Sequence, residues 1–179
     1  MTGKHILIYG ERGSGKTEII DRIIAQCSVP IYGFCTRTVR EKPDGYHEIY
    51  MYPAGKADGH MSSENYVADC NTKDRTVNLE VFRTLGMKYL EAAADGIIVM
   101  DEIGFMEEGV PEFCQAILAH LDGDIPVLAS VKGGKQADFI DSVLNHPKTE
   151  VFRLDGSNKE EIYEQVKLLI MQWNEEIKM

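Results

Sequence analysis

The sequence predicts an α/β fold of three layers, in which a mainly parallel sheet of five strands is flanked by helices. Short apolar segments alternate along the chain with longer segments of helical pattern, which is typical of strands joined by crossover helices. Four of the five apolar segments are nearly continuous runs of Ile, Val, Leu or Met, as expected for strands covered on both faces. The expected strands are 5–9, 31–36, 96–100, 126–131 and 150–154.

Three helices are expected between these strands. The first should begin in the glycine-rich turn at 15–17 and end near residue 27. The second should cover roughly 79–94, and the third should begin at Pro111, because proline suits the first position of a helix. The apolar residues expected on inner faces are Ile19, Ile20, Ile23 and Ile24 of the first helix and Phe113, Ile117 and Leu121 of the third.

A last helix is expected at the C-terminus. Asn158 followed by Glu161 resembles an N-cap residue with its capping-box partner. The apolar residues after it recur at helical spacing and form one stripe. Packing of that stripe on the chain's own sheet is favoured over binding to a partner. The stripe consists of Ile162, Val166, Leu169, Ile170, Trp173 and Ile177.

The pattern changes around residues 42–75, where we expect an added β-hairpin and a long loop. Residues 46–52 alternate in polarity and predict one arm of the hairpin. Residues 53–75 are polar and rich in Gly, Ser, Asn and Asp, which predicts a mobile lid, a substrate loop or local disorder. The chain shows no repeat and no linker, so residues 1–179 are expected to form a single domain.

Composition narrows the function classes. The formal net charge of -10 argues against binding nucleic acid through a broad basic face, although a small polyanion could still be held in a local pocket. No apolar stretch approaches the roughly 20 residues that span a bilayer, so no membrane association is expected. The four cysteines show neither disulfide nor metal-finger spacing, which indicates a reduced, cytoplasmic protein, and the histidines do not suggest a zinc site.

Residues 10–17 read GERGSGKT and match the pattern GxxxxGK[ST] completely, between an expected strand and an expected helix. The glycines let backbone N–H groups surround an anion, and the helix N-terminus adds favourable potential. Lys16 would place a positive charge on the β and γ phosphates, and the Thr17 hydroxyl can ligate Mg²⁺. The residues expected to contact a nucleotide are Gly10, Glu11, Arg12, Gly13, Ser14, Gly15, Lys16, Thr17 and Glu18.

Two acids follow directly after the expected strand at 96–100. In phosphate-loop proteins an acid at this place holds Mg²⁺, often through water, and Asp101 fits that role. Glu102 is expected to orient and deprotonate an attacking water, which favours hydrolysis; the alternative is that Glu102 caps the next segment or faces solvent. Glu107 and Glu108 are expected on a solvated face.

Further polar residues are expected near the transferring phosphoryl group. Positive charge there is expected from Arg12, Arg37 or Arg40, of which the last two lie beyond the second strand. The alternative for Arg37 and Arg40 is a pair of surface cations neutralised by nearby acids. Ser130, at a strand end, either senses the γ-phosphate or water or satisfies a backbone group.

The order of GERGSGKT, GFCTRTVRE, TVNLEVF, VMDEIGFME and PVLAS resembles the small cancer-related nucleoside-triphosphatase family, over about residues 5–165. The resemblance implies Mg²⁺-dependent hydrolysis of ATP, GTP or other nucleoside triphosphates with little base selectivity, on a phosphate-loop (P-loop) NTPase fold. It also implies that Arg40 is the arginine that follows the family's Gly-Phe-x-Thr segment. The chain departs from the family at Phe105, where a lysine is expected, and at Lys159, where an arginine is expected. The arginine expected before the next Gly-aromatic pair is also absent, at Asp44-Gly45-Tyr46.

Two other functions stay open. The segment TRTVREKPDGYHEIY also resembles the acceptor-binding segment of guanylate-type kinases, which predicts transfer of the γ-phosphoryl group to a small acceptor. Such kinases generally lack a glutamate directly after the metal-binding aspartate. A nucleotide-dependent switch with slow hydrolysis would use the same phosphate loop. The oligomeric state is also left open, a monomer included.

Overall fold

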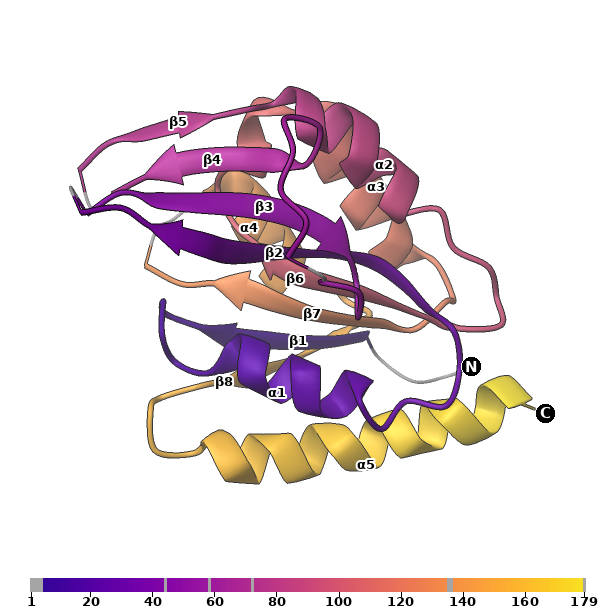
Figure 1. The fold of residues 1–179 in the computed structure, drawn as a ribbon. Helices are drawn as coiled ribbons and strands as arrows, with labels where there is room; N and C mark the ends of the chain where they lie inside the picture. The colour runs from indigo at the N-terminus through magenta and orange to yellow at the C-terminus, as the bar shows by residue number, and fades with distance from the viewer. Residues whose placement is uncertain (1–4, 44, 58, 72, 135–136, 179) are drawn as a thin grey trace.

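The computed structural model describes residues 5–43, 45–57, 59–71, 73–134 and 137–178, without the side chains of residues 40 and 41. Within these residues eight strands form one sheet in the order β5-β4-β3-β2-β6-β7-β1-β8 (Figure 1). Five neighbouring strands are parallel and correspond to the five expected from the sequence. They are β1 (His5–Gly10), β2 (Ile31–Glu41), β6 (Ile97–Ile103), β7 (Val127–Lys132) and β8 (Thr149–Arg153).

The remaining strands form an antiparallel extension at one edge: β3 (His47–Pro53), β4 (Tyr66–Cys70) and β5 (Arg75–Val77). The predicted hairpin is confirmed, because β3 pairs with β2. The prediction of one loop across 53–75 is wrong in part, because that stretch contains β4 and the start of β5. Pairing with β3 orders β4, whose Val67 and Ala68 are fully buried. The five residues of β4 are too few, among polar neighbours, to show the alternating pattern of a strand in the sequence.

Helices cover both faces of the sheet, which confirms the three layers (Figure 1). On one face lie α1 (Lys16–Ile24) and α5 (Lys159–Lys178), which pack against each other. On the other face lie η1 (Phe82–Gly86), α2 (Met87–Tyr89), α3 (Pro111–Asp122) and α4 (Asp138–Leu144), and the short turn η2 (Glu107–Gly109) precedes α3. None of the helices in the described residues is long and apolar enough to cross a membrane.

The buried strands supply apolar side chains to both cores because neighbouring residues of a strand point to opposite faces. Ile6 and Ile8 of β1 belong to the core under α1 and α5, whereas Leu7 belongs to the opposite core with Phe113. All three β1 residues are completely buried. The apolar stripe of α5 also packs into the first core, which confirms that it covers the chain's own sheet.

Several helix boundaries differ from expectation. The segment expected over 79–94 is a π-helical turn followed by α2 and ends at Tyr89, where the chain turns toward β6. The first helix ends at Ile24, and residues 25–26 continue only as a turn. Asn158 precedes α5 as expected, but its Oδ1 accepts a hydrogen bond from the Asp155 amide at 3.1 Å. The Asn158 side chain therefore stabilises the turn that precedes α5.

Candidate active site

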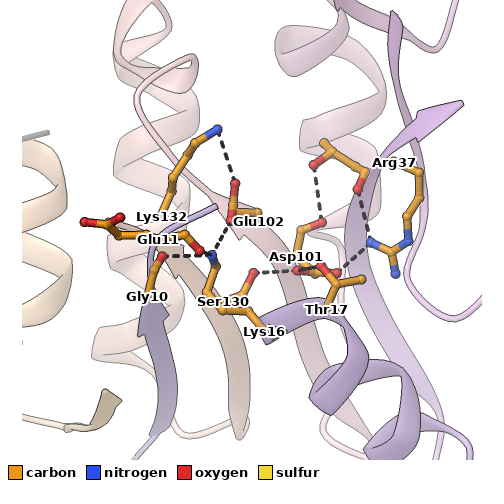
Figure 2. Close-up of polar contacts among 10 residues, drawn as sticks. Gly10, Glu11, Lys16, Thr17, Arg37, Asp101, Glu102, Ser130 and Lys132 are labelled. Carbon is orange, nitrogen blue, oxygen red and sulfur yellow. Dashed lines mark hydrogen bonds and ion pairs between the residues drawn. The ribbon is translucent and has the colours of Figure 1, made fainter. Parts of the chain in front are cut away.

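The carboxyl ends of β1, β6 and β7 meet at one edge of the sheet and gather most of the residues singled out in the sequence (Figure 2). The loop between β1 and α1 supplies the phosphate-loop residues. The end of β6 supplies Asp101 and Glu102, and β7 supplies Ser130. Arg37 lies within β2, the next parallel strand along, and not beyond it as expected, because pairing with β3 continues β2 to Glu41. Strand order in the parallel sheet therefore places residues that are far apart in sequence around one site.

The loop that holds Lys16 has the backbone that its glycines allow. Gly13 and Gly15 have φ values of 79° and 96°, which L side chains rarely adopt, and α1 begins directly after Gly15. Lys16 is 4% exposed. Its ammonium donates hydrogen bonds to the carbonyl oxygens of Gly10 at 2.8 Å and Glu11 at 2.9 Å. Glu11 thus contributes its backbone to the loop, while its side chain is exposed.

Asp101 is 1% exposed and lies at the centre of one polar cluster. Its Oδ1 accepts hydrogen bonds from the Thr17 hydroxyl at 3.3 Å and from the Ser130 hydroxyl at 2.5 Å. Its Oδ2 accepts one from Arg37 Nη1 at 2.6 Å. Ser130 therefore bonds to the buried carboxylate, which neither reading of the sequence anticipated.

Glu102 belongs to a second cluster beside the first (Figure 2). Its Oε2 lies 3.0 Å from Lys16 Nζ and its Oε1 lies 3.7 Å from Lys132 Nζ. The register of β6 against β7 shifts between Met100 and Ile103, and such irregularities re-aim side chains at strand ends. The two consecutive acids thus face different cations. The Glu102 side chain is 25% exposed, so it is partly open to solvent while it lies beside both lysines.

The three arginines differ in their surroundings. Arg37 is shared between Asp101 and Asp21, whose Oδ1 lies 2.8 Å from Arg37 Nη2. Arg12 is exposed and, with Lys16 and Thr17, lines a cavity of about 400 Å³. The side chain of Arg40 lies outside the described part of the structure, although its backbone pairs with β3.

Glu18 does not face the cavity of the phosphate loop. Its side chain is half exposed and forms an ion pair with Lys159, whose Nζ lies 2.8 Å from Glu18 Oε2. This pair links the start of α1 to the start of α5. Lys159 also lies against the loop, because a Cβ at Gly15 would come within 2.7 Å of its side chain.

The expectation that Glu107 lies on a solvated face was wrong, because its side chain is buried. It is 1% exposed, and its Oε2 accepts a hydrogen bond from the Gly104 amide at 3.2 Å. Burial raises the pKa of the Glu107 carboxyl to about 7. The sequence spacing of the acids did not indicate that Glu107 is buried, because the short turn η2 is what directs its side chain inward. Glu108 is exposed, as expected.

The donor atoms fit a bound nucleotide with magnesium. Ser14 Oγ is a buried atom without a hydrogen-bond partner among the described residues, which suits an anionic ligand in the loop. The Thr17 hydroxyl and the Asp101 carboxylate are hard oxygen ligands that lie together. In the described part of the chain no group of three or more His, Cys, Asp or Glu is placed to hold a metal ion. Magnesium beside phosphates needs only one or two protein ligands.

Two residues of the site were missed in the sequence. Lys132 ends β7 beside Glu102, and Asp21 lies one turn into α1 beside Arg37. A signal for Lys132 existed, because the strand that carries Ser130 ends at the same sheet edge two residues later. Asp21 had no comparable signal, since only the packing of α1 beside β2 brings it to Arg37.

Three features together identify the class of protein. They are a glycine-rich loop between the first strand and the first helix, a buried lysine at that loop, and an acid at the end of β6. The fold and site are those of a phosphate-loop nucleotide-binding protein. A family model described as NTPase matches residues 5–167. The chain belongs to this NTPase family.

Named relatives extend this result. The chain is 27% identical to the nucleoside-triphosphatase THEP1 of Natranaerobius thermophilus, over 93% of this chain and 96% of the relative. It is 30% identical to THEP1 of Thermofilum pendens, over 73% of this chain and 75% of the relative.

Two solved structures share the fold. The crystal structure of THEP1 from Aquifex aeolicus superposes with a TM-score of 0.72 at 22% identity, over 93% of this chain and 98% of that one. The solution structure of a human cancer-related nucleoside triphosphatase superposes with a TM-score of 0.68 at 21% identity, over 95% of this chain and 98% of that one.

Proposed function

We propose that the protein hydrolyses nucleoside triphosphates to the diphosphate and orthophosphate, with magnesium and with broad base specificity. The observation that carries this proposal is the position of Glu102. Its carboxylate lies 3.0 Å from the ammonium of Lys16, the group that contacts the terminal phosphate in this class. A base held there is within reach of a water that attacks the γ-phosphorus.

The phosphate loop would bind the triphosphate. Its backbone N–H groups and the start of α1 favour anionic oxygens, and Ser14 Oγ offers a further donor. Lys16 would exchange the carbonyls of Gly10 and Glu11 for β- and γ-phosphate oxygens. Thr17 and Asp101 would hold magnesium, which neutralises charge on the phosphates when bound.

Glu102 would act on the water. Its carboxylate accepts a proton from the water as the new oxygen–phosphorus bond forms and the bond to the β-phosphate bridging oxygen breaks. Lys16 and Lys132 hold the carboxylate from two sides. A positioned base of this kind contributes about 10²–10⁴-fold to the rate.

The arginines would supply positive charge to the transferring group. Arg37 lies beside the proposed metal position through Asp101, and Arg12 lies in the loop itself. Arg40 keeps its proposed role from the family resemblance alone. Broad base specificity is supported by the names of the relatives, which specify nucleoside triphosphates as a class. We also propose a reducing, cytoplasmic location, which the four free cysteine thiols support.

A kinase remains the second candidate because of a further cavity. A space of about 610 Å³ adjoins the phosphate-loop cavity, and Arg37 and Thr38 line both. An acceptor in that space would lie next to Arg37, which pairs with Asp101 beside the proposed metal position.

One experiment separates the two reactions. Orthophosphate and nucleoside diphosphate are measured from ATP, GTP, CTP and UTP, with magnesium or with a chelator, and with or without a panel of nucleoside monophosphates. We expect orthophosphate from several triphosphates without any acceptor, lost with the chelator and in Lys16→Ala. Diphosphate that forms only with an added monophosphate would overturn hydrolysis in favour of the kinase.

A further inference from the structure

A basic pocket opens from the phosphate-loop cavity on the side of Glu102. Its volume is about 370 Å³, and four cationic side chains line it: Arg12, Lys73, Arg75 and Lys132. Arg12 and Lys132 also line the phosphate-loop cavity, so the two spaces are neighbours. Lys132 reaches Glu102 at 3.7 Å, which places the basic pocket next to the proposed site of water attack.

The cations of the basic pocket have few counter-charges. Among the described residues, Arg12, Lys73 and Arg75 form no ion pair with a carboxylate. Asp74 is the acid in the lining, and its Oδ1 accepts a hydrogen bond from the Arg75 amide at 2.8 Å. These four cations lie together although the chain as a whole has a net charge of -10. Like charges held close together repel each other, and a bound anion would relieve that repulsion.

Phe105 holds two of these cations in place. The Arg75 guanidinium carbon lies 4.6 Å from the centroid of its ring, and Lys132 Nζ lies 5.2 Å from it. Cation–π contacts of this length orient the charged groups without neutralising them. Arg75 and Lys132 thus bring positive charge, from β5 and β7, to the place where the family pattern leads us to expect a lysine at position 105.

We propose that the basic pocket binds a second phosphate group beside the position that the terminal phosphate of a nucleoside triphosphate would occupy. Guanidinium and ammonium groups that converge with few carboxylate partners are donors that bind phosphate oxygens. The phosphate has two possible sources: orthophosphate as it leaves after hydrolysis, or the phosphate of a second substrate. Its place beside a triphosphate rests on the proposed function, whereas binding of phosphate by the pocket does not.

The test measures binding of inorganic phosphate by calorimetry to the whole chain saturated with a non-hydrolysable triphosphate and magnesium. The variants are Arg75→Glu and Lys73→Glu, and Arg75→Gln tests loss of charge without reversal. The control is Lys88→Glu, an exposed lysine of α2 that does not line the pocket. Melting temperature confirms that each variant folds.

We expect wild type and Lys88→Glu to bind phosphate equally, and both reversals to weaken binding at least tenfold with triphosphate affinity unchanged. Orthophosphate should also inhibit turnover of the reversal variants less. The same titration with nucleoside monophosphates identifies the source of the phosphate. If a monophosphate binds more tightly than orthophosphate, and the reversal variants lose that binding, the pocket is assigned to a second substrate. Phosphate affinity that is absent, or the same in all variants, overturns the proposal. Failure of the proposed function would show separately, as absent triphosphate binding or hydrolysis.

Discussion

At the scale of single residues, Asp101 and Arg37 form an ion pair in which the carboxylate is almost fully buried. Asp101 is 1% exposed, and the Arg37 side chain is 21% exposed. A buried carboxylate is stable only when its charge is matched and its oxygens are hydrogen-bonded. Arg37 therefore balances the acid that we propose as a magnesium ligand, and a metal ion bound there would compete with the guanidinium for the carboxylate.

Arg37→Ala should destabilise the fold because it leaves Asp101 buried without its cationic partner. The expected loss is about 3 kcal/mol, or roughly 6–12 °C in melting temperature. Magnesium ions should restore part of it, since they supply the missing charge at the same oxygens. The measurement is thermal unfolding of wild type and variant over a magnesium titration.

Asp21→Asn is the matched control. It removes the other acid that pairs with Arg37, but the Asp21 side chain is 56% exposed, so the stability change should stay below about 1 kcal/mol. Equal responses of wild type and Arg37→Ala to magnesium would show that Arg37 and the metal do not share Asp101.

Glu107 should make the protein less stable as pH rises. Burial raises the pKa of its carboxyl from 4.5 to about 7, so the folded state binds the proton more tightly than the unfolded state does. Its stabilising effect is complete below about pH 4.5 and is lost as pH rises through about 7. Across that window the change is about 3 kcal/mol.

Glu107→Gln should remove this dependence, because the amide keeps an acceptor for the Gly104 N–H but does not ionise. Denaturant unfolding from pH 4.5 to 8 measures the stability difference between variant and wild type. That difference should grow in favour of the variant by about 3 kcal/mol. A difference that stays constant over the range would mean that Glu107 does not titrate there.

At the scale of elements, strands β2 and β6 leave no room for a side chain at Gly33. Its φ is +100°, and a Cβ there would lie 1.9 Å from the carbonyl oxygen of Val99. Only glycine allows this approach. The pairing matters for the site, because β2 carries Arg37 and β6 carries Asp101.

Gly33→Ala should cost at least about 3 kcal/mol, since backbone must move in the middle of the sheet. Gly156→Ala is the control, with φ +90° and nothing within 4 Å of the added Cβ, and should cost about 1–2 kcal/mol. Thermal unfolding compares the two variants. Similar losses would show that the close approach to β6 adds no strain of its own.

The sequence predicted the parallel strands well and the edge of the sheet poorly, for physical reasons. Buried strands must be apolar on both faces, so β1 and β6 stand out as continuous runs. The strands β4 and β5 depend on pairing with a neighbour, and a stretch of five or three residues carries too little pattern. The second helix ended at Tyr89 although residues 91–94 are good helix formers, because propensity alone does not fix where a helix ends.

At the scale of the whole molecule, the site was predictable wherever a role requires a fixed local motif. The phosphate loop and Asp101 could be placed at the candidate site because each lies at or near the end of a strand, where the carboxyl ends of the strands meet. Partners joined only by folding were not found, as Lys132 beside Glu102 and Asp21 beside Arg37 show. The basic pocket is of the same kind, since β5, β7 and the phosphate loop assemble it.

The central claim is that Glu102 activates water, and Glu102→Gln tests it most directly. Glutamine keeps the size of the side chain but cannot take the proton. Affinity for a non-hydrolysable triphosphate should stay the same or increase, because Lys16 loses its carboxylate partner. The rate of orthophosphate release at saturating triphosphate should fall at least about tenfold. Undiminished release by Glu102→Gln would contradict the account and remove the main reason to favour hydrolysis over phosphoryl transfer.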